Sequence, residues 1–119
     1  MKIVFITGVS GTMGSEALKQ IAQTGTFRCR VLLRPKKANI KLAKKLQKNE
    51  NIEVLFGDIQ NYEDCLAGVK DADYVLHCAA IIPPAADHNH DEAFRTNWMG
   101  TQNLLNAVVE NGQIEKTKF

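Results

Sequence analysis

The sequence predicts an α/β fold in which helices cover both faces of a parallel sheet. Four short segments are predicted to be strands: Ile3–Ile6, Phe27–Leu33, Ile52–Phe56 and Asp73–Cys78. The first is a continuous apolar run, which is typical of a strand buried on both faces of a parallel sheet. Apolar residues recur at helical spacing after each run, in residues 15–24, 40–48, 62–69 and about 91–111. Because helices that join parallel strands cross over right-handed, this alternation predicts a three-layer, doubly wound sheet with strand order 3-2-1-4. The 119 residues suit a single domain.

Turn and capping residues set the limits of these elements. Gly25 ends the first helix, Pro35 breaks the second strand, Asn61 is an N-cap, and Gly112 follows the last helix. The last helix carries a periodic set that we expect to face inward: Phe94, Asn97, Thr101, Leu104, Leu105 and Val108.

A glycine-rich turn joins the first predicted strand to the first predicted helix. Gly8, Gly11 and Gly14 have the spacing G-x-x-G-x-x-G. One glycine allows a sharp turn, one lets the backbone approach a pyrophosphate, and one lets helix and strand pack closely. The free N–H groups of the first helical turn would then point at the phosphates. We therefore predict nucleotide binding here; the alternative is a purely structural turn.

Composition and cysteine content indicate what kind of protein this is and where it is located. The chain is 45% hydrophobic and 24% charged, and no apolar run approaches the roughly 20 residues that span a membrane. Cys29, Cys65 and Cys78 are odd in number and widely spaced, and no signal-peptide pattern precedes the first strand. These features favour reduced thiols and a cytoplasmic location.

Two charged segments suggest other ligands, and we favour neither. Nine Lys or Arg and no acid lie between Arg28 and Lys48, which could attract nucleic acid. The segment lacks interleaved aromatic residues, so a solvated helix face beside a phosphate site is the simpler interpretation. A second segment crowds Asp87, His88, His90 and Asp91 into one loop, but no distant cluster completes a metal site.

The chain as a whole resembles the N-terminal half of an extended short-chain dehydrogenase/reductase, the family of NAD(P)-dependent epimerases, dehydratases and reductases. The resemblance rests on matches in the family's order and spacing: Thr7-Gly8-x-x-Gly11-x-x-Gly14, Arg34, Gly57-Asp58-Ile59, His77-Cys78-Ala79-Ala80 and Asn97-x-x-Gly100-Thr101-x-Asn103-Leu104-Leu105. It implies a Rossmann fold with a dinucleotide cofactor. The implied cofactor-binding residues are Thr7, Gly8, Ser10, Gly11, Thr12, Met13, Gly14, Arg34, Asp58, Ile59, Cys78, Ala79, Ala80 and Asn97.

The resemblance also implies a role for each group. The loop from Gly8 to Met13 would hold the pyrophosphate, and Asp58 would accept a hydrogen bond from the adenine amino group while Ile59 lies against the ring. Ala79 and Ala80 would lie beneath the nicotinamide ribose. Asn97 would support the active-site backbone. The alternatives are that Asp58 is only a turn former and that Asn97 is solvated.

Arg34 bears on the choice of cofactor. NAD-selective sites place Asp or Glu at the end of the second strand, about 20 residues past the glycines, to bind the ribose 2′-hydroxyl. Arginine occupies that place here, and a guanidinium can bind a 2′-phosphate. We therefore predict a preference for NADP(H), with NAD(H) possible; the alternative is an arginine that faces solvent.

The family's catalytic Tyr-x-x-x-Lys pair does not occur in the sequence. Tyr62 is followed four residues later by Leu66, and Tyr74 by Cys78. Residues 116–119 resemble the start of a fifth strand, so we expect a fragment that binds cofactor but is inactive alone. The parent protein would transfer hydride to or from a sugar nucleotide or another small hydroxyl or carbonyl substrate. The alternative is a non-catalytic NADP-sensing module.

Ending the chain at the fifth strand has a consequence for assembly. The fourth strand would become an apolar sheet edge, and such edges pair with other chains. We therefore expect self-association through Asp73–Cys78. We expect neither nucleic acid nor a membrane as a partner.

Overall fold

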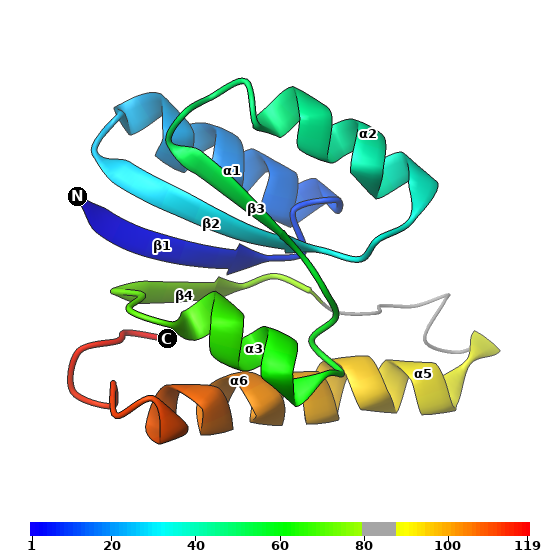
Figure 1. Ribbon diagram of the computed structural model, residues 1–119. Helices are drawn as coiled ribbons and strands as arrows, with labels where there is room; N and C mark the ends of the chain where they lie inside the picture. Colours follow the sequence, from blue (N-terminus) through cyan, green and yellow to red (C-terminus); the bar gives the residue numbers. More distant parts are fainter. Residues whose placement is uncertain (80–87) are drawn as a thin grey trace.

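The computed structural model describes residues 1–79 and 88–119, which form a parallel sheet with helices on both faces (Figure 1). The strands are β1 (Lys2–Thr7), β2 (Phe27–Leu33), β3 (Ile52–Phe56) and β4 (Tyr74–His77). The helical segments are α1 (Thr12–Thr24), α2 (Lys37–Leu46), α3 (Tyr62–Val69), α5 (His90–Phe94), the π-helical turn η1 (Arg95–Met99) and α6 (Gly100–Glu110). The strand order is β3-β2-β1-β4, with all pairs parallel. The predicted fold class and strand order are confirmed.

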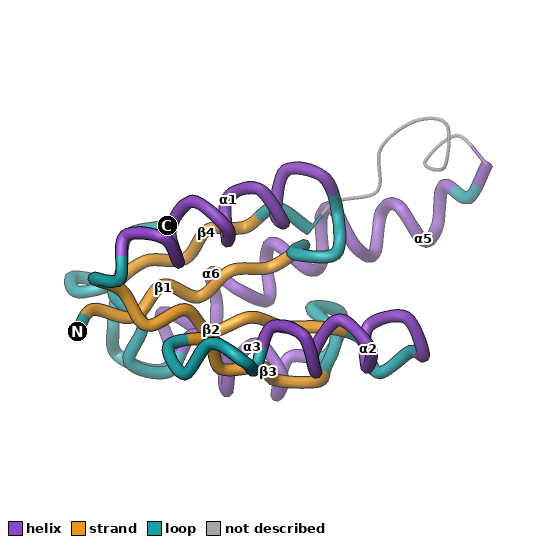
Figure 2. Tube along the Cα trace, turned by 90° about the horizontal axis from the view of Figure 1, so that it is seen from above, coloured by secondary structure: helices purple, strands orange, loops and turns teal. Residues whose placement is uncertain are grey.

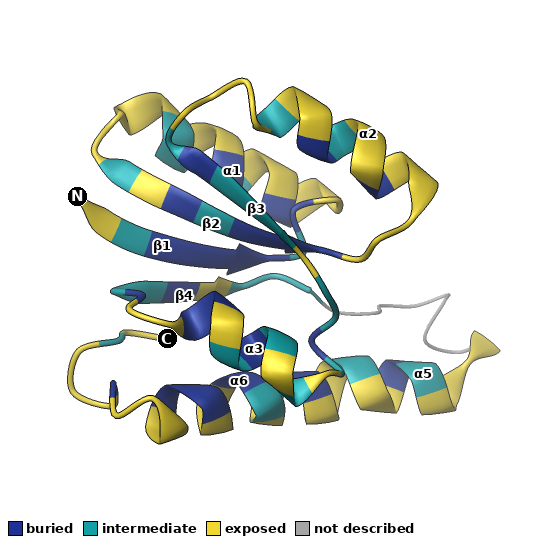
Figure 3. Ribbon diagram, viewed as in Figure 1, coloured by how far each residue is buried: buried dark blue, intermediate teal, exposed yellow. Residues whose placement is uncertain are grey.

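Strand β1 lies in the middle of the sheet and is buried on both faces, as its unbroken apolar sequence predicted (Figure 3). Val4 and Ile6 pack into the layer with α1 and α2, where Leu18 and Ala43 lie. Phe5 points to the opposite face. Because successive side chains alternate between faces, both layers of helices are anchored on this one strand.

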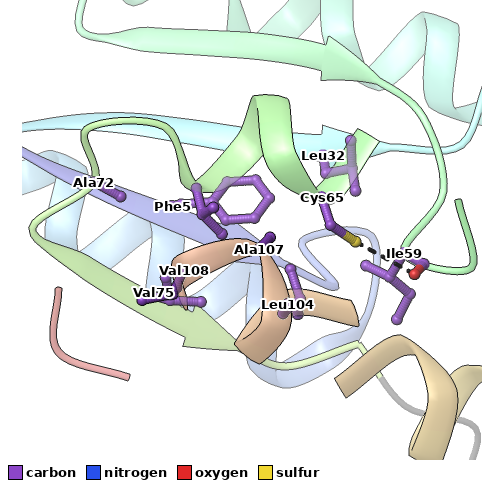
Figure 4. Packing of buried hydrophobic residues seen from close by; sticks show 10 residues of the cluster. Phe5, Leu32, Ile59, Cys65, Ala72, Val75, Leu104, Ala107 and Val108 are labelled. Atoms are coloured by element: carbon purple, nitrogen blue, oxygen red, sulfur yellow. Dashed lines mark hydrogen bonds between the residues drawn. The ribbon is translucent and has the colours of Figure 1, made fainter. Parts of the chain in front are cut away.

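The second layer packs around the Phe5 ring, with side chains from α3 and α6 (Figure 4). Gly68 lets α3 approach closely, because a Cβ there would collide with the ring of Phe5. Leu104 is fully buried on α6. The thiol of Cys65 donates to the carbonyl of Ile59 at 3.3 Å, which fastens the loop after β3 to α3.

The predicted long helix is present as α5, η1 and α6 in succession, but its inward face differs from the prediction. Leu104 and Val108 are buried as expected, whereas Phe94, Asn97 and Leu105 are exposed. The residues that face inward nearer its start are small, because Ile59 fills the space there. A Cβ on Gly100 would come within 2.6 Å of Ile59 Cδ1. Glycine at position 100 therefore lets this part of the helix lie against Ile59.

Most of the predicted caps are confirmed. The Asn61 side chain accepts from the Glu63 N–H at 3.0 Å, and Gly25 and Gly112 both have φ near +68°. Helix α2 begins at Lys37 and not at Ile40, so its predicted start was wrong. The buried Asn39 donates to the carbonyl of Arg34 at 2.9 Å, which stabilises this earlier start.

The end of the chain pairs with β4. The Lys118 N–H donates to the Asp73 carbonyl at 2.9 Å, and the Val75 N–H donates to the Lys118 carbonyl at 2.8 Å. This parallel bridge covers the start of the β4 edge, so the expectation of a wholly bare edge was wrong there. Self-association stays a prediction, now restricted to the part of β4 beyond Val75.

The carboxyl ends of the parallel strands and the start of α1 lie on the same side of the molecule (Figure 2), and Thr96 of η1 lines a cavity with them. Crevices at this end of an open parallel sheet are the usual place for a ligand.

Candidate functional site

The packing of the fold itself requires glycine at two of the three glycine positions in the turn between β1 and α1. Gly8 has φ +78°, and a Cβ there would lie 2.5 Å from the Ala79 backbone nitrogen. A Cβ on Gly14 would collide with the carbonyl of Gly8. At Gly11 the nearest atom to such a Cβ is the Gly8 carbonyl oxygen, at an ordinary 3.5 Å. The fold itself therefore does not require glycine at position 11.

Gly11 is the N-cap residue of α1 and lines a cavity at the carboxyl ends of the strands. It has no side chain to accept a bond from the first amides of α1, and the first turn carries no acidic residue. Backbone N–H groups at such a helix start attract anions.

The cavity brings together most of the predicted site residues: Thr7, Gly8, Ser10, Gly11, Arg34, Asp58, Ile59, Cys78 and Ala79. Thr12, Met13, Gly14 and Asn97 are not among its lining residues, and Met13 is 79% exposed. Gly14 lies outside the cavity lining, but its lack of a side chain lets α1 pack closely against the backbone of Gly8. Ala80 lies outside the described residues.

The cavity also includes residues that the sequence did not single out as cofactor ligands: Leu32, Leu33, Asn39, Gly57 and Thr96. Leu32, Leu33 and Gly57 lie at the ends of β2 and β3, where the predicted topology would have placed them. Asn39 and Thr96 are on helices, and no local pattern distinguishes them from surface residues.

Thr7 connects the ends of β1 and β4 beside the cavity. Its side chain is almost fully buried, and its oxygen accepts from the backbone N–H groups of Cys78 and Ala79 at 3.1 and 3.2 Å. His77 Nδ1 lies 2.6 Å from the same oxygen. These bonds hold the backbone that lines the cavity on its β4 side.

The hydrogen bonds define the tautomer of His77. The Thr101 hydroxyl donates its one hydrogen to the Asn97 carbonyl at 2.8 Å, so His77 Nε2, at 2.9 Å, donates to Thr101. Nδ1 then accepts from the Thr7 hydroxyl. Burial lowers the pKa of His77, in agreement with a neutral ring. His77 thus has a structural role: its ring connects Thr7, at the end of β1, to Thr101 on α6.

Asp58 begins the turn after β3 at the rim of the cavity. Its Oδ1 accepts from the Gln60 N–H at 2.9 Å, and its own N–H donates to Asp64 Oδ2 at 2.9 Å. Asp58 therefore takes part in the turn, and its predicted role as a cofactor ligand stays a prediction. Because the residue also lines the cavity, the turn places a carboxylate where a ligand can meet it.

Arg34, at the end of β2, lines the cavity with its side chain about half exposed. Its Nη1 lies 4.0 Å from Oε1 of Glu92 on α5. Asn97 lies on η1, exposed, with its carbonyl bonded by Thr101. Such π-helical turns are frequent at functional sites.

Comparisons with known proteins assign the chain to a family. Residues 4–117 match the family described as "Polysaccharide biosynthesis protein". The chain belongs to this family. Together with the epimerases and dehydratases that the chain is similar to, this match confirms the resemblance to extended short-chain dehydrogenases/reductases.

Three similar proteins illustrate the match. An "uncharacterized membrane protein" of Methanocaldococcus jannaschii is 30% identical, over 97% of this chain and 34% of its own length. A UDP-N-acetylglucosamine 4,6-dehydratase (inverting) of Campylobacter jejuni is 30% identical, over 93% of this chain and 34% of its own length. The structure of UDP-glucuronic acid 4-epimerase from Bacillus cereus, in complex with UDP-glucuronic acid and NAD, superposes with a TM-score of 0.74 at 27% identity. The match covers 91% of this chain and 36% of the epimerase chain.

The chain thus spans about a third of the length of the relatives that it matches. In residues 1–79 and 88–119, no helix combines the length and apolar character needed to cross a membrane. The same residues contain no group of three or more His, Cys, Asp or Glu side chains placed to hold a metal.

Proposed function

We propose that this chain is the dinucleotide-binding part of an NAD(P)-dependent epimerase, dehydratase or reductase that acts on a sugar nucleotide or another small hydroxyl or carbonyl substrate. The observation that carries this proposal is Gly11. It lines the cavity at the start of α1, yet the fold leaves room for a side chain there. A glycine is needed at that place if a bulky anion lies against the backbone.

The lining residues divide the cavity into parts that fit a dinucleotide. The turn Gly8–Gly14 and the start of α1 would hold the pyrophosphate. Asp58 and Ile59 would hold the adenine, and Cys78 and Ala79 would lie beneath the nicotinamide ribose. The bound cofactor supplies the hydride chemistry, and this chain supplies its orientation. Thr7 and His77 would keep the β4 side of the site in place.

Arg34 supports a preference for NADP(H) over NAD(H). Its guanidinium lies at the end of β2 in the cavity lining, where a 2′-phosphate would come within reach. The neighbours that were solved with NAD support NAD(H) as a ligand and give no support to the preference. The preference therefore rests on Arg34 alone.

Fluorescence titration of the purified chain with NADPH and NADH tests dinucleotide binding. We expect both to bind, NADPH more tightly, and we expect Gly11→Val to reduce both affinities while the circular dichroism spectrum is unchanged. Failure of both nucleotides to bind at millimolar concentration would contradict the proposal.

A non-catalytic dinucleotide sensor is the second candidate, because neither Tyr62 nor Tyr74 belongs to a Tyr-x-x-x-Lys pair. A protein containing this chain that turns over a UDP-sugar would favour the enzyme. Dinucleotide binding with no turnover would favour the sensor. A cytoplasmic location and self-association through β4 remain further proposals, the first supported by free thiols at Cys29, Cys65 and Cys78.

A further inference from the structure

A carboxylate lies beside Arg34 although the sequence around β2 has none. Glu92 comes from α5, far along the chain, and its Oε1 is 4.0 Å from Arg34 Nη1. In NAD-selective sites the acid that meets the ribose 2′-hydroxyl stands at the end of the second strand itself. Here arginine occupies that end, and the acid reaches the same region from a helix in the other layer.

Glu92 is held in place by donors on both of its oxygens. Gln60 Nε2 donates to Oε1 at 3.3 Å, and Arg95 Nη2 donates to Oε2 at 2.9 Å. Gln60 Nε2 also lies 3.2 Å from the hydroxyl of Thr96, a residue of the cavity lining. The Glu92 carboxylate is therefore hydrogen-bonded on both oxygens and lies beside two residues of the cavity lining, Arg34 and Thr96.

The same neighbours keep Glu92 ionised. The hydrogen bond from Arg95 is the largest cause that lowers the pKa of Glu92, and Gln60 and the charge of Arg34 act in the same direction. At neutral pH a fixed negative charge thus lies between the guanidinium groups of Arg34 and Arg95.

This arrangement has opposite consequences for the two cofactors. A 2′-phosphate would have to share Arg34 with Glu92 and would be repelled by its charge. A 2′-hydroxyl would meet no such repulsion and could donate to a carboxylate. We propose that Glu92, acting through Arg34, weakens the selectivity of this site for NADP(H). The inference rests on the dinucleotide binding proposed above.

The test is the ratio of NADPH to NADH affinity, measured by fluorescence titration of the whole chain. Glu92→Gln removes the charge and keeps the size of the side chain and an oxygen that accepts hydrogen bonds. We expect it to raise the ratio about tenfold, the effect of one unit charge near a half-exposed phosphate. The control Glu115→Gln makes the same charge change at an exposed residue outside the cavity lining and should leave the ratio unchanged.

A second variant separates the route through Arg34 from a general charge effect. Arg34→Met should lower the ratio of NADPH to NADH affinity. When Glu92→Gln is added to Arg34→Met, we expect the ratio to rise by much less than the roughly tenfold rise that Glu92→Gln causes in the unaltered chain. If both nucleotides bind and Glu92→Gln leaves the ratio unchanged, the inference is overturned while dinucleotide binding stands. An equal rise with Arg34→Met present overturns the route through Arg34. If neither nucleotide binds to the unaltered chain, the proposed function fails and this inference fails with it.

Discussion

Replacing Gly11 and Gly14 with alanine, one at a time, separates what the glycine turn does for the fold from what it does for a ligand. Both residues belong to the same turn and the same helix start. A Cβ at position 14 would collide with the carbonyl of Gly8, whereas a Cβ at position 11 would have 3.5 Å to its nearest neighbour. The two variants add the same methyl group to very different surroundings.

The expected magnitudes follow from these surroundings. In Gly14→Ala the colliding atoms are backbone, which cannot rotate away, so we expect a loss of about 2 kcal/mol in the free energy of unfolding. That corresponds to a fall in Tm on the order of 5–10 °C. Gly11 has φ −91° and ψ 176°, which alanine adopts readily, so Gly11→Ala should cost less than about 1 kcal/mol.

The ligand should reverse this order. In Gly11→Ala the new methyl enters the cavity where the pyrophosphate would lie, and we expect NADPH affinity to fall about tenfold. Urea denaturation gives the stability of each variant, and fluorescence titration gives its affinity. Equal destabilisation by the two substitutions, or full NADPH affinity in Gly11→Ala, would refute this account of the turn.

Three further predictions concern β4 and its neighbours. Burial lowers the pKa of His77, so the unfolded chain binds a proton at this residue more readily than the folded chain does. The free energy of unfolding should therefore be highest above about pH 6.5 and fall below it. Urea denaturation above and below that pH should show a smaller fall in His77→Gln than in the unaltered chain. Thr7→Val removes the side-chain acceptor of the Ala79 amide, while the Cys78 amide keeps its 3.2 Å bond to the Thr7 carbonyl; the change should cost about 1–3 kcal/mol, whereas Thr7→Ser should cost much less. Pairing through the uncovered end of β4 predicts dimers by light scattering at high concentration; a strict monomer would count against it.

The fold was predictable because its pattern is local and repeats. The apolar run of β1 and the turn glycines define a buried strand followed by a helix, and the handedness of crossovers then leaves one simple strand order. The inward face of the last helix was harder to predict. Its packing depends in part on Ile59, a residue from a distant turn, because Ile59 leaves no room for a Cβ at Gly100.

The site was predictable where its residues follow the ends of strands. Arg34 comes directly after β2 and Asp58 comes two residues after the end of β3, so topology alone brings them to one cavity. Glu92 and Thr96 reach the same place from a helix, and their approach depends on how α5 and η1 are placed against the sheet. The sequence carries no local signal for that placement, so the carboxylate beside Arg34 appears only in the structure.

Dinucleotide binding at this cavity can be tested by NMR titration of the isotope-labelled chain with NADPH, which reports where a ligand binds as well as whether it binds. We expect the largest backbone amide shifts at Gly8, Gly11, Arg34, Asp58 and Ala79, which line the cavity. Absence of shifts at millimolar NADPH, or shifts confined to the opposite end of the sheet, would contradict it.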